Sequence, residues 1–283
     1  TMHFNAFPLS DYPGRQEYWL IPWIEYDENG VFSRRIPAPE MMAKMREMGA
    51  KVVQINHPTD NQGYLNAIGF DRLVGSSSAD QTQWSADFDI VEVYNGKDWG
   101  EMTENAMPDW FALLNEGFQF KATGNSDSHD EGHSSGYPRN YIKVADDRAG
   151  GFTSDEALDS LLDGGSIVCG GPFITFSIDD SATLGDTYQP EAAEIKGMIK
   201  VEAADWVGFS KVDVVENGQV IEEFEVINDH TSEALVFEKE FTITPVKDSW
   251  YVIRAYDTSA NLSPEAPGAV SYSFTNPIWV DLN

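Results

Sequence analysis

The sequence predicts an α/β fold over residues 1–177, built as a mainly parallel sheet or a barrel, and a small antiparallel β-sandwich over residues 178–283. Two observations predict this division. In the first part, helix and strand patterns alternate with short connections, which is typical of α/β folds. In the second part strand patterns occur without a competing helix pattern, which favours a sandwich.

The first predicted elements surround a histidine. Pro39–Met48 reads as a helix whose methionines lie on one face and indicate core packing. Lys51–Asn56 follows as a short apolar strand and leads directly into His57. Phe88–Tyr94 is the next predicted strand. The candidate site residue His57 is therefore expected at a strand end.

The elements that complete the α/β part come next in the chain. Pro108–Leu114 is a predicted helix with proline in its first turn. Phe118–Thr123 and Tyr141–Val144 are predicted strands. Thr153 and Glu156 have the spacing of a capping box and predict the start of a further helix.

The pattern changes after about residue 177. The polar stretch Asp179–Lys196 is interpreted as a linker. Asn217 and Gly218 stand between two strand patterns and predict a tight type I′ hairpin. Further strands are predicted at Leu235–Thr244, Trp250–Tyr256 and Val270–Phe274.

Charge and composition exclude several classes of partner. The chain has 18 Lys and Arg against 47 Asp and Glu, and its net charge of −29 disfavours nucleic acid and anionic membrane surfaces. No apolar run approaches the roughly 18 residues that a membrane span needs. The single Cys169 excludes an internal disulfide and leaves the compartment open, with an extracytoplasmic or secreted location among the options.

Four residues form the predicted metal site. Asp127 and His129 are two positions apart, so their side chains point the same way if the segment is extended. A carboxylate and an imidazole that converge on one point are typical ligands of a divalent metal ion. His3 and His57 complete the predicted set. Mixed nitrogen and oxygen ligands suit zinc, manganese and iron alike.

The predicted chemistry is hydrolysis by metal-activated water, because a bound divalent ion lowers the pKa of its water from ~15.7 toward ~7. No Gly-rich phosphate loop, nucleophile elbow or Cys-x-x-Cys pair competes with it. Asp127, His129 and Arg139 are the catalytic candidates, with Arg139 either clamping an anionic substrate or forming a structural salt bridge. Glu92 is either a ligand or general base, or faces another layer. His133 is either a substrate group or an exposed loop residue.

Several motifs occur in an order that resembles the CehA/McbA-type metallohydrolases of the PHP (polymerase and histidinol phosphatase) superfamily. They lie at 1–9, 55–58, 91–96, 124–129, 136–140, 170–173 and 274–281. The resemblance implies a distorted β/α barrel with up to three divalent metals, used to hydrolyse phosphoesters or, in some branches, ester and carbamate bonds.

Within this resemblance, His3 matches a histidine of a middle motif, His57 the His-Pro histidine, and Asp127 with His129 the closing Asp-x-His. The family's opening His-x-His would precede His3, so the resemblance implies the C-terminal portion of a phosphoesterase-like domain and a partial barrel. We therefore expect incomplete metal occupancy, or a missing segment supplied by a partner chain or a cleaved piece.

Two functions follow as hypotheses. The first is a metal-dependent hydrolase of small anionic, phosphoester-type substrates. The second is a non-catalytic module that binds a carbohydrate or a protein and keeps a degenerate metal site. The absence of an opening His-x-His from this sequence favours the second.

Overall fold

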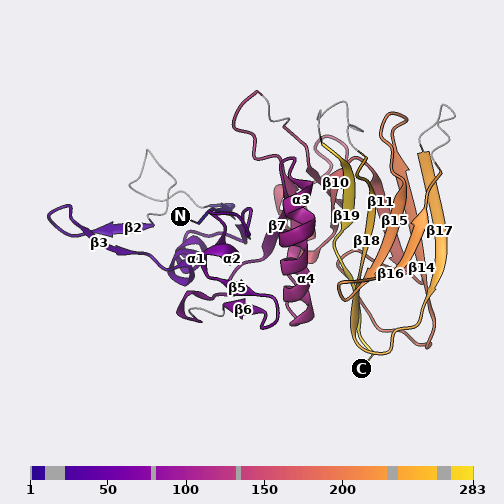
Figure 1. Cartoon of the computed structure of the whole chain (residues 1–283), viewed down its shortest axis with the longest axis horizontal. Coiled ribbons are helices and arrows are strands. Elements are labelled where there is room, and N and C mark those ends of the chain that lie inside the picture. Colours follow the sequence, from indigo (N-terminus) through magenta and orange to yellow (C-terminus); the bar gives the residue numbers. More distant parts are fainter. Residues whose placement is uncertain are drawn as a thin grey trace. The chain divides into compact units, whose positions relative to one another are not determined.

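The computed structural model describes residues 2–9, 23–77, 81–131, 135–227, 235–259 and 269–282. The chain divides into two compact units, Thr1–Glu92 and Val93–Asn283, and Figure 1 shows the elements of both. The predicted domain boundary after residue 177 stays a prediction.

The first unit is built around a short sheet. Strand β1 (Phe4–Phe7) runs antiparallel to β4 (Val52–Ile55), and β4 runs parallel to the beginning of β7 (Ile90–Asn95). Helix α1 (Ala38–Glu47) precedes β4 and buries Ala38 and three of its methionines, which confirms the predicted helix. The smaller elements are β2 (Ile24–Tyr26), β3 (Phe32–Arg35), α2 (Tyr64–Ala67), β5 (Phe70–Asp71), β6 (Ser76–Ser77) and η1 (Gln81–Gln83).

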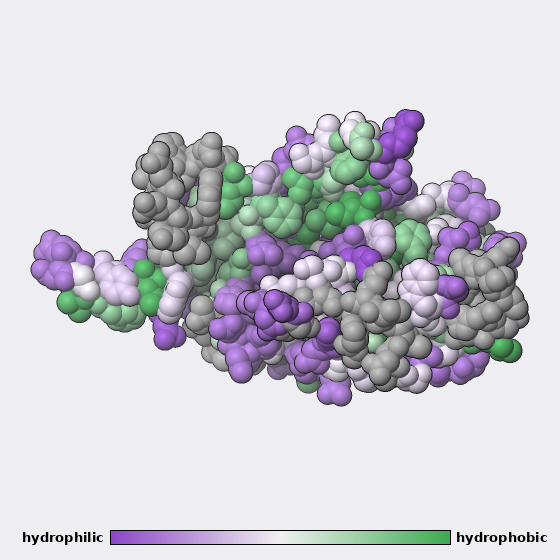
Figure 2. All heavy atoms as spheres, turned by 90° about the horizontal axis from the view of Figure 1, so that it is seen from above, coloured by the Kyte–Doolittle hydropathy of each residue, from purple (hydrophilic) through white to green (hydrophobic). Residues whose placement is uncertain are grey.

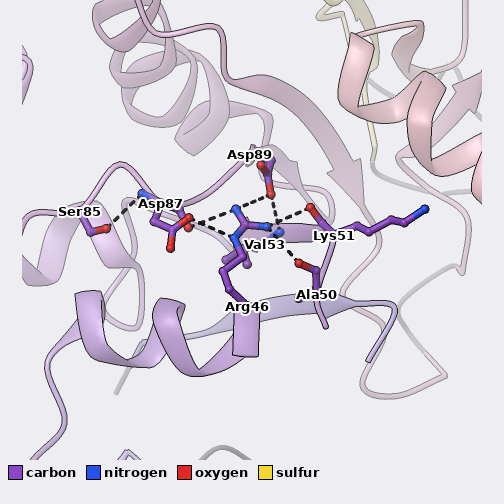
Figure 3. Close-up of polar contacts among 7 residues, drawn as sticks. All are labelled: Arg46, Ala50, Lys51, Val53, Ser85, Asp87 and Asp89. Carbon is purple, nitrogen blue, oxygen red and sulfur yellow. Dashed lines mark hydrogen bonds and ion pairs between the residues drawn. The ribbon is translucent and has the colours of Figure 1, made fainter. Parts of the chain in front are cut away.

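Arg46 ties the end of α1 to the strands beside it (Figure 3). Its guanidinium donates to Asp87 Oδ1 at 3.0 Å, to Asp89 Oδ2 at 2.9 Å and to the carbonyl of Lys51 at 2.9 Å. Asp89 Oδ2 also accepts the N–H of Val53 at 2.7 Å. Burial alone would lower the pKa of Arg46, but the two carboxylates outweigh it and raise that pKa. These bonds fix where β4 begins, and β4 carries the chain to His57.

The second unit begins with helices and one more strand of the first sheet. It holds α3 (Trp99–Glu101), the π-helix η2 (Met102–Ala106), α4 (Met107–Asn115) and β8 (Lys121–Asn125), and the strand order of this sheet is β1-β4-β7-β8. Helix α5 (Ser154–Asp163) starts where the capping box predicts, because Thr153 Oγ1 accepts the N–H of Glu156 at 3.1 Å.

The rest of the second unit is a two-layer β structure. An eight-stranded sheet has the order β13-β20-β18-β19-β10-β9, with β15 joined to β18 and β16 joined to β15. A four-stranded sheet has the order β12-β11-β14-β17. Apolar side chains from β11, β14 and β17 pack with those of β15, β18 and β20 in one core. The strands are β9 (Arg139–Ile142), β10 (Ser166–Gly170), β11 (Phe173–Ile178), β12 (Ala182–Thr183), β13 (Thr187–Tyr188), β14 (Ile195–Ala203), β15 (Lys211–Glu216), β16 (Gln219–Glu225), β17 (Leu235–Ile243), β18 (Ser249–Asp257), β19 (Ser271–Thr275) and β20 (Ile278–Val280).

One local prediction in this region is confirmed and one is wrong. Asn217 and Gly218 have φ angles of 50° and 85° and join β15 to β16, as a tight hairpin requires. The predicted linker Asp179–Lys196 instead contains β12, β13 and the start of β14. Strands β12 and β13 have two residues each, so the alternation of polar and apolar residues is too brief to predict them.

The predicted α/β fold with a partial distorted β/α barrel is wrong. The described residues form open sheets: β1 pairs antiparallel with β4, and the strand that follows β8 joins a different sheet by antiparallel pairing with β10. Alternating helix and strand patterns predict the order of elements along the chain, but they do not determine which strands pair. In the described part of the chain, no helix is both long and apolar enough to span a membrane.

Candidate functional site

Strands β1 and β4 bring His3 and His57 together. Phe4 is paired with Ile55 in antiparallel register, so the residue before β1 lies beside the residues that follow β4. The N–H of Asn56 donates to the carbonyl of His3 at 3.1 Å. The ring nitrogens His3 Nδ1 and His57 Nε2 are 3.0 Å apart. Backbone pairing thus places two imidazoles, 54 positions apart in sequence, edge to face.

His57 follows β4 and is contacted by Asp60 of the same loop and by Glu92 of β7. His57 Nδ1 lies 2.8 Å from Asp60 Oδ1, and the backbone N–H of His57 donates to Glu92 Oε2 at 2.6 Å. Glu92 reaches this position because β4 and β7 are parallel neighbours. The φ of His57 is 27°, a conformation that costs free energy and is often found at functional sites. The side chain of His57 is only 12% exposed.

The His3–His57 pair fits a divalent metal ion. Two imidazole nitrogens bound to one tetrahedral zinc at ~2.0–2.1 Å lie about 3.3 Å apart, close to the 3.0 Å observed. With its proton on Nδ1, His57 would donate a hydrogen bond to the Asp60 carboxylate and would leave the Nε2 lone pair directed toward His3. A carboxylate behind a ligating histidine is a common arrangement in metal sites.

Asp127 and His129 lie together in an exposed loop of the second unit. Strand β8 ends at Asn125, and Asp127 has a φ of 45°, so this segment is bent rather than extended. His129 Nδ1 lies 2.7 Å from the carbonyl oxygen of Asp127 and 3.5 Å from its Oδ1. The side chains of His129 and Asp127 are 72% and 43% exposed. His133 lies outside the described residues.

Arg139 occupies β9, opposite Cys169 of β10. Its side chain lines a cavity of about 340 Å³ together with Tyr137 and Glu202. Burial raises the pKa of Tyr137 to about 12, although its hydrogen bond to Tyr94 lowers it. The predicted role of Arg139 as an anion clamp stays a prediction.

The predicted ligands therefore form one pair in each unit. Among the described residues, no group of three or more His, Cys, Asp or Glu side chains is arranged to hold a metal ion. The predicted set of four ligands draws on both units and stays a prediction. Asp60 is not among the site residues predicted from the sequence. An aspartate three residues after His57, in a turn, is the signal that could have revealed it. Glu92, left open by the sequence, is buried and bonded to the backbone of His57.

The comparisons with known proteins identify no family. No family model and no curated protein matches the chain. One similar solved structure is the CARDB domain of a protein from Pyrococcus furiosus, with 20% identity and a TM-score of 0.25, covering 40% of this chain and 98% of that domain. A TM-score this low carries no argument. The resemblance to PHP-type phosphoesterases is therefore corrected, because no family model matches and the described residues form open sheets instead of a barrel.

Proposed function

We propose that the chain is a metal-dependent hydrolase in which His3 and His57 bind a divalent metal ion. One observation carries the proposal: two imidazole nitrogens lie 3.0 Å apart, and a carboxylate orients one of them. A partly buried histidine pair with such a carboxylate is better explained by ligand binding than by packing, since packing needs neither the oriented lone pair nor the positive φ of His57.

Each neighbour of the pair has a distinct part in this proposal. When bound, a divalent ion supplies a nucleophile by lowering the pKa of its water. Asp60 holds the tautomer and ring plane of His57. Glu92 holds the backbone of His57 through its N–H and so keeps the ring at the end of β4. Small anionic esters, with phosphate esters first among them, are the substrates to test.

The experiment measures metal binding and hydrolysis on the same preparations. The purified chain is titrated with Mn²⁺ and Zn²⁺ in competition with a chromogenic chelator, and then assayed on p-nitrophenyl phosphate and p-nitrophenyl acetate. We expect the His57→Ala variant to lose both binding and hydrolysis. The control is Glu28→Ala, which removes an exposed carboxylate in the turn between β2 and β3 and should change neither.

The second candidate is a non-catalytic binding module with a degenerate metal site. It is favoured by the small number of converging donors, since the described residues contain no group of three that could hold a metal ion. If neither metal binds to the parent chain and His57→Ala changes nothing, the hydrolase proposal is refuted and this candidate stands.

A further inference from the structure

We propose that the second unit binds a neutral oligosaccharide in a groove lined by Tyr141, Phe173 and Trp206. This site lies wholly within residues 137–207 and uses none of the residues of the proposed metal site. The proposal therefore goes beyond metal-dependent hydrolysis and does not depend on it.

Two neighbouring cavities make up the groove. One has a volume of about 340 Å³ and the other about 980 Å³. Tyr141 and Phe173 line both, and their rings meet edge to face with centroids 5.2 Å apart. Ligand sites in proteins usually have volumes of ~300–1,000 Å³. Two cavities joined at one aromatic pair suit a ligand of several linked rings better than a single compact molecule.

Exposed aromatic side chains gather at this groove. Tyr141 is 44% exposed, Phe173 39% and Trp206 58%. Single exposed aromatic residues are ordinary, but a cluster around a concavity marks a binding surface. Such rings provide flat apolar faces, and the apolar face of a sugar ring packs on a flat aromatic surface.

The charged residues of the smaller cavity are balanced. Arg139 and Glu202 both line it, and Glu202 is paired with Lys200 at 3.1 Å. An arginine supplies only hydrogen-bond donors and a carboxylate only acceptors, so together they suit a ligand that both donates and accepts. Sugar hydroxyls do both.

The larger cavity is also lined by equal numbers of positive and negative side chains. Lys143 and Arg148 line it along with Asp146 and Asp147, and Arg148 is paired with Asp146 at 2.6 Å. A chain with a net charge of −29 repels anions in general. Walls with balanced charge give no local attraction to reverse that repulsion, nor any special attraction for cations. Because the walls favour neither anionic nor cationic ligands, a neutral ligand fits the groove best.

Strands hold the groove residues in place. Arg139 and Tyr141 are alternate residues of β9 and so lie on one face of it, and β9 pairs with β10. Phe173 of β11 is directly opposite Glu202 of β14. The groove is thus built from the eight-stranded and the four-stranded sheet, and a preorganised site loses little entropy when a ligand binds.

The test titrates the full chain with a panel of pentasaccharides while tryptophan fluorescence is recorded. The neutral probes are cellopentaose, xylopentaose, maltopentaose and penta-N-acetylchitopentaose, and pentagalacturonic acid is the acidic probe. We expect at least one neutral probe to bind and the acidic probe not to bind. The Trp206→Ala and Tyr141→Ala variants, followed by calorimetry, should bind roughly tenfold more weakly, the order of a lost aromatic contact.

A matched control uses Trp99, which is 37% exposed but lines neither cavity. The Trp99→Ala variant should bind as the parent chain does. The proposal is overturned if no neutral probe binds, if the acidic probe binds more tightly than the neutral ones, or if Trp99→Ala weakens binding as much as Trp206→Ala. Addition of a chelator should leave binding unchanged, which separates this result from the outcome for the metal site.

Discussion

The ring of His57 is fixed by contacts with three other residues. Asp60 faces Nδ1, His3 faces Nε2, and Glu92 accepts the backbone N–H. Gly63 closes the same loop so tightly that a Cβ there would lie 2.2 Å from the carbonyl oxygen of Pro58. The imidazole is therefore preorganised, and any metal bound there would meet a ring that has little rotational freedom left to lose.

The first prediction concerns Asp60. The Asp60→Asn substitution would keep a side-chain oxygen to accept the N–H of Gln62 but would no longer present a carboxylate to His57. We expect this variant to bind Mn²⁺ or Zn²⁺ roughly 10–100-fold more weakly, as loss of a carboxylate behind a ligating histidine usually does. Isothermal titration calorimetry measures the change. Asp27→Asn, at another turn carboxylate that accepts two backbone N–H groups, is the control and should bind as the parent does.

The second prediction concerns the pH dependence of stability and Tyr64. Burial raises the pKa of Tyr64 to about 12, although the N–H of Ser85 lowers it, whereas an unfolded tyrosine titrates near ~10. The folded state therefore holds this proton more tightly. The contribution of Tyr64 to the free energy of unfolding is complete below pH ~10 and is lost as the pH rises toward about 12.

Urea unfolding between pH 9 and pH 12 tests this dependence. The free energy of unfolding of the parent chain should fall more steeply than that of Tyr64→Phe, with a difference on the order of 2–3 kcal/mol. Parallel slopes for the two proteins would show that Tyr64 ionises as easily in the folded state as in the unfolded one.

At the scale of the elements, the buried side-chain amide of Asn276 joins β8 to β10. Asn276 follows β19 and is fully buried. Its Oδ1 accepts the N–H of Ala122 at 2.8 Å, and its Nδ2 donates to the carbonyls of Ala122 at 3.2 Å and Ser166 at 3.1 Å. Side-chain bonds thus join β8 to the start of β10, although the two strands belong to different sheets.

The third prediction removes this amide. Asn276→Ala leaves the buried N–H of Ala122 without its acceptor, and each unsatisfied buried polar group costs ~1–3 kcal/mol. We expect the free energy of unfolding to fall by roughly 3 kcal/mol in urea denaturation. Gln219→Ala, on an exposed position of β16, is the control and should change it by less than about 0.5 kcal/mol. An equal loss in both variants would contradict the role of Asn276.

Across the whole molecule, charge is the dominant property. Hydrophilic residues are spread over the face shown in Figure 2, with hydrophobic residues between them. The chain carries 47 acidic against 18 basic residues, so most carboxylates have no cation to pair with. Their mutual repulsion opposes compact folding and is screened by salt.

The fourth prediction follows from this repulsion. Raising NaCl from 10 mM to 200 mM at pH 7 should increase the melting temperature by roughly 5 °C, because the Debye length falls from ~30 Å to below ~10 Å. Differential scanning calorimetry measures the shift. Further addition of NaCl to 500 mM should change it much less. A melting temperature that falls on the first addition would show that specific ion pairs outweigh general repulsion.

The sequence by itself determined the local elements of this protein. Helix α5 with its Thr153 cap and the Asn217–Gly218 hairpin depend on neighbouring residues, whose propensities the chain encodes directly. Only the tertiary structure decided that the strand after β8 leaves the first sheet, because pairing depends on contacts between distant segments. The same reason explains the site: His3 and His57 meet through the register of β1 with β4, and no spacing in the sequence encodes that register.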